Sequence, residues 1–229
     1  FIFGYIRDHS SGNISINAGL DTATYAQVGN GGWQNKGSNT GDIHVTSGGT
    51  LQVAGGANTT GWGTHESYGQ IGHGGRDADD DQTGVIKVRS GGAVSVIGGE
   101  SFRNYAQIGH GGERSTGVHN GLISVVAGTG TSVIQGGQGT ESDESYAQIG
   151  HGGHEARGNK TGKIEFVTTS GGNLNVISGG NGAGNSYALI GHGGSSMTAA
   201  EVINGDVAVV IDGELSLQQN NQNLSLIHI

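Results

Sequence analysis

Four histidines recur in the same short motif, and they are the residues of this sequence best suited to chemistry. His73, His110, His151 and His192 each stand inside the tetrapeptide GHGG, five residues after a tyrosine, and Asn30 holds the equivalent place in the first copy. Neutral imidazole is the commonest metal ligand among protein side chains. One interpretation is therefore a line of transition-metal sites.

Repetition of the motif favours a structural role over a metal site. Equivalent residues of stacked repeats lie about 4.8 Å apart, so each histidine would bring one nitrogen, whereas zinc is held by three or four protein ligands at about 2.0–2.3 Å. We therefore expect each histidine to bond to a turn carbonyl and to form part of a polar ladder. No catalytic, cofactor-binding or metal-ligating residue is assigned, and the four histidines are the candidates should a transition metal bind.

An acidic run offers a second kind of metal ligand. Asp77, Asp79, Asp80 and Asp81 supply the hard oxygen ligands that calcium uses, within the loop RDADDDQT. An isolated acidic loop is more often solvated charge, and the matching loops WQNKGSNT, ERSTGVHN and HEARGNKT carry no such cluster. No cofactor is expected, and calcium stays open for this loop alone.

Aromatic residues are candidates for contact with sugars. The tyrosines that open the motif could form a platform, but stacked tyrosines also cover apolar surface and fix register without any ligand. Trp33 and Trp62 occur once each, in loops. These two tryptophans are therefore the candidates for ligand contact.

Composition excludes several classes of protein. Glycine makes up 49 of the 229 residues and proline is absent, which with no Gly-X-Y period removes collagen. The net charge of −9 and the scattered ten Lys and Arg argue against nucleic acid as a partner, because phosphate contacts need clustered basic charge. No apolar run reaches the roughly 18–20 residues that cross a bilayer, so we expect no membrane-spanning segment. The lack of cysteine excludes disulfides.

The tyrosines give the period of the repeat. They stand at positions 25, 68, 105, 146 and 187, with spacings of 43, 37, 41 and 41 residues. A period in the range of about 20–50 residues indicates a solenoid or a propeller. Each period is interpreted as three short strands: one of the type GxIxV, one such as TLQVAGG, and YAQIGHGG. Apolar residues alternate with polar ones in the first strand: Ile43 and Val45, Ile86 and Val88, Ile123 and Val125, Ile164 and Phe166, and Val207 and Val209.

The predicted fold class is all-β, a parallel β-helix solenoid with three short strands per coil of about 41 residues and about five coils. Strands this short gain stability by pairing in register with the next repeat, and the Gly-rich corners supply the sharp turns. Two coils of about 20 residues per period is the alternative, although it needs more strands than the pattern offers. A β-propeller is weaker still, because its blades need four strands.

Residues 1–224 are predicted to form a single repeat domain within a larger protein. Ile14 and Ile16 are interpreted as the first strand of a degenerate opening repeat that lacks a full second strand. Residues 225–229, SLIHI, resemble translated sequencing-adapter sequence and are predicted to be a non-native tail.

Loop lengths separate a constant part of the repeat from a variable one. The loop after the GHGG corner has eight residues in four successive repeats, whereas the loop before the tyrosine changes from ANTTGWGTHES to ESFRN, QGTESDES and NGAGNS. Variable loops on a constant scaffold are where binding specificity is found.

The strand pattern GxIxVxxGGxLxVxGG joined to SYAQIGHGG resembles the repeats of large bacterial surface proteins of the filamentous haemagglutinin and autotransporter-passenger type, over about residues 12–217. The resemblance implies a right-handed parallel β-helix. It also implies export across the outer membrane, an extracellular or outer-membrane location, and a role as adhesin, fibre or spacer. The period of about 41 residues is longer than the coils of about 20 common in haemagglutinin-type repeats.

An enzyme is the competing class, because many β-helices degrade polysaccharides. Such a site needs paired carboxylates, or acids with a basic partner. Glu141, Asp143 and Glu144 lie in one loop, but we find no pair at matching places of neighbouring repeats with a basic residue beside it. We therefore expect no catalytic activity.

The function that the sequence favours is structural and adhesive: a repeat segment of a secreted or cell-surface bacterial protein that displays variable loops. Expected partners are glycans or proteins of a host or a neighbouring cell, with end-to-end or lateral self-association as a further option. The alternative is a polysaccharide-binding or polysaccharide-degrading β-helix.

Overall fold

The protein is built from parallel strands that pair with their counterparts in the neighbouring repeats. The computed structural model describes residues 4–57, 66–140, 142–180, 184–197, 201–219 and 225–227. Within these ranges 22 strands form one sheet of ten strands and two sheets of six, and all pairs are parallel. The described residues contain no helix, so none of them belongs to a helix able to cross a membrane.

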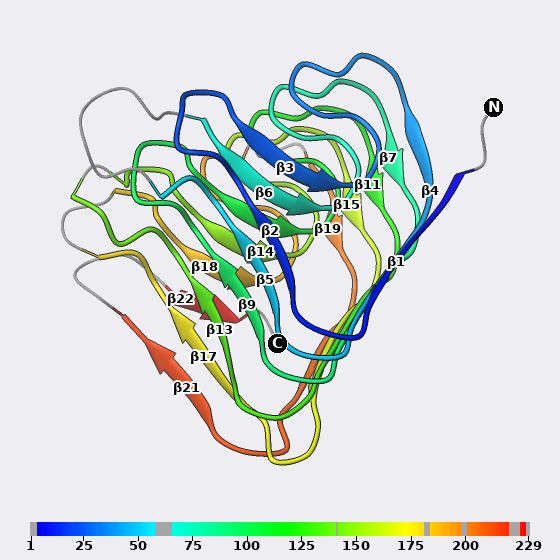
Figure 1. Ribbon diagram of the computed structural model, residues 1–229. Helices are drawn as coiled ribbons and strands as arrows, with labels where there is room; N and C mark the ends of the chain where they lie inside the picture. The colour runs from blue at the N-terminus through cyan, green and yellow to red at the C-terminus, as the bar shows by residue number, and fades with distance from the viewer. Residues whose placement is uncertain are drawn as a thin grey trace.

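Sheet A is the ten-stranded sheet. Its strands are β1 (Gly4–Ser10), β4 (Asn39–Ser47), β7 (Gln82–Thr83), β8 (Ile86–Ser90), β11 (His119–Asn120), β12 (Ile123–Ala127), β15 (Lys160–Thr161), β16 (Ile164–Thr168), β19 (Ile203–Asn204) and β20 (Val207–Val210). The long strand β4 pairs with β7 through its first residues and with β8 through its last. Two stacks of strands therefore meet at β4, and the sheet curls (Figure 1).

Two six-stranded sheets complete the fold. Sheet B consists of β2 (Ile14–Asn17), β5 (Leu51–Ala54), β9 (Val94–Ile97), β13 (Thr131–Gln135), β17 (Asn173–Ile177) and β21 (Leu215–Gln218). Sheet C consists of β3 (Tyr25–Val28), β6 (Tyr68–Ile71), β10 (Ala106–Ile108), β14 (Ala147–Ile149), β18 (Ala188–Ile190) and β22 (Ser225–Ile227). We call the strands that one repeat gives to the three sheets a layer; the six layers follow one another from blue to red in Figure 1.

The predicted fold class is wrong. The chain does not form a regular β-helix solenoid with three strands per coil and about five coils; it forms three all-parallel sheets, one of them curled, with six layers in sheets B and C and four strands in each layer from the third onward. All-parallel sheets are typical of α/β proteins, whose crossovers are helices. In the described part of this chain, loops make the crossovers instead.

The missed strands are the two-residue strands β7, β11, β15 and β19. The first three end the loops RDADDDQT, ERSTGVHN and HEARGNKT, and β19 likewise ends the corresponding segment of the last repeat; the sequence pattern assigned all four to loop. Two residues are too few to show a period of two, and these strands exist because each pairs with its counterpart in the next layer.

The opening repeat also differs from the prediction. Ile14 and Ile16 form β2 and pair with Leu51 and Val53 of sheet B. They therefore belong to the second strand type, and β1 takes the first place in sheet A.

Of the segment 225–229, Ser225–Ile227 form β22 and pair with β18.

One apolar cluster joins the three sheets. Alternate residues of each strand point into it, such as Ile123 and Val125 of sheet A, Val96 of sheet B, and Ala106 and Ile108 of sheet C, all with at most 1% of their surface exposed. In-register pairing places like beside like, for example Ile123 beside Ile164. The small side chains of this glycine-rich sequence are sufficient because stacking repeats the same contact layer after layer.

The glycine after each sheet C strand is required by close approach of the backbone. A Cβ at Gly150 would overlap the carbonyl oxygen of Gly191 in the next layer, and Gly72 and Gly109 have the same relation to their neighbours. Gly12 contrasts with these positions, because a Cβ there would stand 3.9 Å from the hydroxyl oxygen of Ser10, an ordinary van der Waals distance.

We expect Gly150→Ala to lower the free energy of unfolding by roughly 3 kcal/mol or more, because the added methyl forces two layers apart. Gly12→Ala is the matched control and should change it by less than about 0.5 kcal/mol. Urea unfolding followed by circular dichroism measures both. Equal stability of the two variants would show that the layers are not packed as closely as described.

Candidate functional site

The four predicted histidines form one column along the stack. The rings of His73, His110, His151 and His192 are stacked, with centroids 4.9 Å apart and interplanar angles of 2–8°. Each follows the glycine that ends a sheet C strand. The in-register pairing of sheet C therefore places the rings directly over one another.

Both nitrogens of each ring are hydrogen-bonded to backbone. The backbone N–H of His110 donates to Nδ1 of His151 at 3.0 Å, and the same bond links each layer to the next, beginning with Asn30 to His73 at 2.9 Å. A nitrogen that accepts an N–H carries no proton, so the proton is on Nε2. Nε2 of His110 then donates to the carbonyl of Gly84 at 2.9 Å, with equivalent bonds elsewhere in the column.

This arrangement leaves no lone pair on the rings for a metal. Successive rings also face one another in parallel planes instead of converging on a point, as a tetrahedral site would need. In the part of the chain that the structure describes, no group of three or more His, Asp or Glu is arranged to hold a metal ion. The ladder interpretation, a histidine bonded to a turn carbonyl, matches the geometry.

Burial keeps the column neutral. It lowers the pKa of His110 to about 3, with a further contribution from the stacked His73. It lowers the pKa of His151 well below its usual value, and it lowers the pKa of His73 and His192 in the same direction. A charged imidazole would lose its Nδ1 acceptor and would face another ring of the column.

Glutamine and tyrosine form two further columns, on the face of sheet C that points away from the apolar cluster. Nε2 of Gln107 donates to the carbonyls of Gly150 and Gly152 in the next layer, at 2.9 and 3.0 Å. The tyrosines from Tyr25 to Tyr187 stack with centroids 4.8–5.0 Å apart. Tyr105 and Tyr146 are fully buried, so they offer no platform to a sugar, whereas Tyr25 of the first layer is half exposed.

The aspartates of the acidic loop do not converge. Asp77 forms ion pairs with Arg76 and Arg114, at 3.1 and 3.3 Å, Asp79 accepts a hydrogen bond from Lys36 at 2.5 Å, and Oδ1 of Asp81 accepts the backbone N–H of Val118 at 2.8 Å. These three carboxylates face different neighbours. The contacts do not assemble the oxygen cage that calcium needs.

Of the two predicted contact residues, one is described. Trp33 is 40% exposed, and the guanidinium of Arg76 lies 5.7 Å from the centre of its ring, a cation–π contact. Trp62 lies outside the described residues, as does Glu141.

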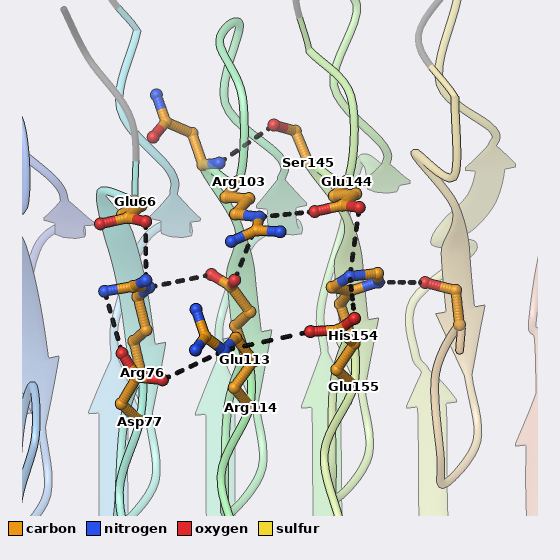
Figure 2. Close-up of polar contacts among 12 residues, drawn as sticks. Glu66, Arg76, Asp77, Arg103, Glu113, Arg114, Glu144, Ser145, His154 and Glu155 are labelled. Carbon is orange, nitrogen blue, oxygen red and sulfur yellow. Dashed lines mark hydrogen bonds and ion pairs between the residues drawn. The ribbon is translucent and has the colours of Figure 1, made fainter. Parts of the chain in front are cut away.

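Beside the tyrosines lies a charged network that the sequence reasoning missed (Figure 2). Nη2 of Arg76 bonds to Glu66 at 2.6 Å, and its Nε bonds to Glu113 at 3.2 Å. Nε of Arg103 forms an ion pair with Glu113 at 3.3 Å and donates a hydrogen bond to Glu144 at 2.6 Å. Two carboxylates of neighbouring layers therefore do share a basic partner, contrary to the expectation from sequence.

The network extends through a histidine into a fourth layer. Nε2 of His154 lies 3.2 Å from Glu144, and its Nδ1 lies 2.8 Å from the hydroxyl of Ser195. Burial lowers the pKa of His154, which Glu144 and Glu155 raise in opposition. Beside this series of contacts, Arg114 bridges Asp77 and Glu155 at 3.3 and 4.0 Å (Figure 2).

Aligned by layer, the network is a checkerboard of charge. Three columns contribute one residue per layer: Glu66, Arg103 and Glu144; Arg76, Glu113 and His154; and Asp77, Arg114 and Glu155. Sign alternates along each column and within each layer, where His154 completes the pattern only when its ring is protonated. The sequence signal was present, because the residue after GHGG is Arg76, Glu113 and His154 in successive repeats, but it shows only when the repeats are aligned.

Glu113 is the most buried member, with 1% of its side chain exposed against 2% for His154. Burial raises its pKa to about 7, against the opposing effect of Arg76 and Arg103. Chemically the network could donate and accept protons, but the carboxyl groups face guanidinium groups of the same protein. The arrangement is one of mutual neutralisation between layers.

The comparisons with known proteins identify no relative. No protein-family model, no curated protein and no solved structure matches the chain.

We expect the histidine column to make stability depend on pH. The folded state binds fewer protons than the unfolded state between about pH 3 and 6.5, so the free energy of unfolding rises with pH across this window and is lost as the pH falls through it. Each such histidine contributes up to about 1.4 kcal/mol per pH unit. In His110→Asn, which copies Asn30, the slope from pH 4.5 to 6.5 should fall by about one proton. An unchanged slope would show that His110 titrates normally when folded.

Glu113 should act in the opposite direction. With a folded pKa of about 7 the folded state holds more protons than the unfolded state between pH 4.5 and 7, so the stability from this group falls as the pH rises. As the pH rises from 4.5 to 7, the free energy of unfolding of Glu113→Gln should therefore increase relative to that of the unmodified protein by up to about 3 kcal/mol, measured by urea unfolding. A gain toward low pH instead would mean that Arg76 and Arg103 outweigh burial.

Proposed function

We propose that the chain is a non-catalytic, structural and adhesive repeat segment of a secreted or cell-surface bacterial protein, of the filamentous haemagglutinin and autotransporter-passenger type. One observation carries the proposal. The repeating side chains that could do chemistry are already hydrogen-bonded between layers. Each ladder histidine, for example, makes two hydrogen bonds to backbone groups. What remains for recognition is the part that varies from layer to layer.

Display of variable loops is the proposed mechanism. Parallel backbone pairing along the stack gives a stiff support, and loops of unequal length leave it before each tyrosine. Trp33, held on one side by Arg76 and otherwise 40% exposed, is suited to pack on a sugar ring or an apolar side chain. The proposed partners are glycans or proteins of a host or a neighbouring cell, at an extracellular or outer-membrane location.

End-to-end self-association is part of the same proposal. In the last described layer Val210 is 58% and Leu217 55% exposed, and β20 and β21 lie at the edges of their sheets. Such an edge with apolar side chains favours pairing with a further strand, either of a following repeat or of a second copy.

Polysaccharide binding or degradation is the alternative. The bridge from Arg103 to Glu113 and Glu144 favours it to the extent that glycoside chemistry uses paired carboxylates. The side chains of Glu113 and Arg76 are buried, however, so a polymer cannot reach them. We therefore propose no catalytic residue.

Glycan arrays and cell-binding assays test the proposal. We expect the protein to bind, and Trp33→Ala to weaken binding about tenfold, because an aromatic anchor is worth on the order of 1–2 kcal/mol. Lys163→Ala, at an exposed position outside these loops, is the control and should bind as the unmodified protein does. Absence of binding on every array would leave a spacer, and hydrolysis or elimination of a polysaccharide would reinstate the enzyme.

A further inference from the structure

The outward face of sheet A near β1, β4 and β8 gathers basic side chains. Parallel register places residues of successive strands side by side: Arg7, His44, Lys87 and Ser124 in one column, and His9, Thr46, Arg89 and Val126 in the next. They alternate with the core residues of the same strands, such as Val45 and Val88. We call this surface the basic face.

Most other Lys and Arg side chains of the protein form ion pairs with carboxylates. Six of the ten Lys and Arg form ion pairs with carboxylates: Lys36, Arg76, Arg103, Arg114, Lys160 and Lys163. Arg7, Lys87 and Arg89 lie on the basic face. Among the described residues Lys87 and Arg89 form no ion pair, and both are exposed.

Folding gains nothing from placing Lys87 and Arg89 together. Successive strands are about 4.8 Å apart, and residues two apart on one strand are about 6.6 Å apart, so like charges here repel one another. In a chain with 19 Asp and Glu, carboxylates were available at neighbouring positions, as the checkerboard shows. The charge of these two side chains is better explained by an anion from outside.

The basic face also contains a groove of about 200 Å³. Its lining includes His44, Thr46, Lys87, Arg89, Ser124 and Val126. Cations alternate here with hydroxyl groups and one apolar side chain. This combination fits a sugar that carries a carboxylate, since hydroxyls bond to hydroxyls and valine covers a ring face.

We propose that the basic face binds an acidic polysaccharide, with Lys87 and Arg89 holding its carboxylates and Thr46 and Ser124 bonding to its hydroxyl groups. The inference rests on the proposed function in that it names a polysaccharide as the ligand class, but it places the contact on a sheet face and not on the loops. A nucleic acid fits less well, because its bases stack on aromatic side chains and the groove lining contains no Trp, Tyr or Phe.

Isothermal titration with polygalacturonate at low and moderate salt tests the proposal, with neutral dextran as the reference polymer. We expect binding of polygalacturonate that weakens as salt rises, and none of dextran. The double variant Lys87→Gln, Arg89→Gln should bind at least tenfold more weakly. The control Lys36→Gln, Arg157→Gln makes the same change in net charge elsewhere and should lose less than twofold. All four side chains are exposed, so both variants should fold, which circular dichroism checks.

Equal loss in the two double variants would overturn the proposal, because net charge alone would then explain binding. It would also be overturned if only duplex DNA, anionic vesicles or self-association depended on Lys87 and Arg89. Trp33→Ala separates this surface from the loops: it should leave polygalacturonate binding unchanged. Failure of loop-dependent binding on the arrays would thus leave the basic face standing, and loop-dependent binding without binding of polygalacturonate would count against the basic face alone.

Discussion

Every other feature depends on parallel, in-register pairing of each strand with its counterpart one repeat away. Because the strands are two to nine residues long, none could hold its place alone, and each layer provides the hydrogen-bond partners of the next. Register at one strand then sets register at all three sheets. Identical residues meet at the strand spacing, which is why rings stack at 4.8–5.0 Å and why isoleucine meets isoleucine in the core.

The same pairing explains what became of the chemistry in the GHGG motif. Layers at this separation bring the backbone N–H of one corner within reach of the imidazole of the next. The ring accepts on Nδ1 and donates from Nε2, so it satisfies two backbone groups at a corner where strand pairing has ended. Glycines surround it because a Cβ at Gly109 or Gly150 would overlap the adjacent layer. Both ring nitrogens are therefore occupied by backbone groups of the corner, and neither is left for a reaction.

Charged residues that differ between equivalent positions of the layers distinguish one layer from the next. In the checkerboard, Arg76 faces Glu113 and Arg103 faces Glu144 in the next layer, and Arg103 also faces Glu113 within its own layer; loss of one partner from such a buried set typically costs about 3–5 kcal/mol. On the outward face of sheet A the opposite occurs, because Lys87 and Arg89 lie together without forming an ion pair among the described residues. The first arrangement neutralises charge between layers, and the second leaves charge for solvent or a ligand.

The sequence by itself determined the period, the alternating core residues of sheets A and B, and the ladder role of the histidines, because these follow from local spacing and from repetition. Only the tertiary structure decided the short strands β7, β11, β15 and β19, since two residues carry no periodicity and become strands by pairing with a distant counterpart. It likewise decided that Ile14 pairs with Leu51 and that Arg103 joins Glu113 to Glu144. Residues 37 to 43 positions apart in the chain become neighbours through the stacking of layers, a contact that local sequence patterns do not encode.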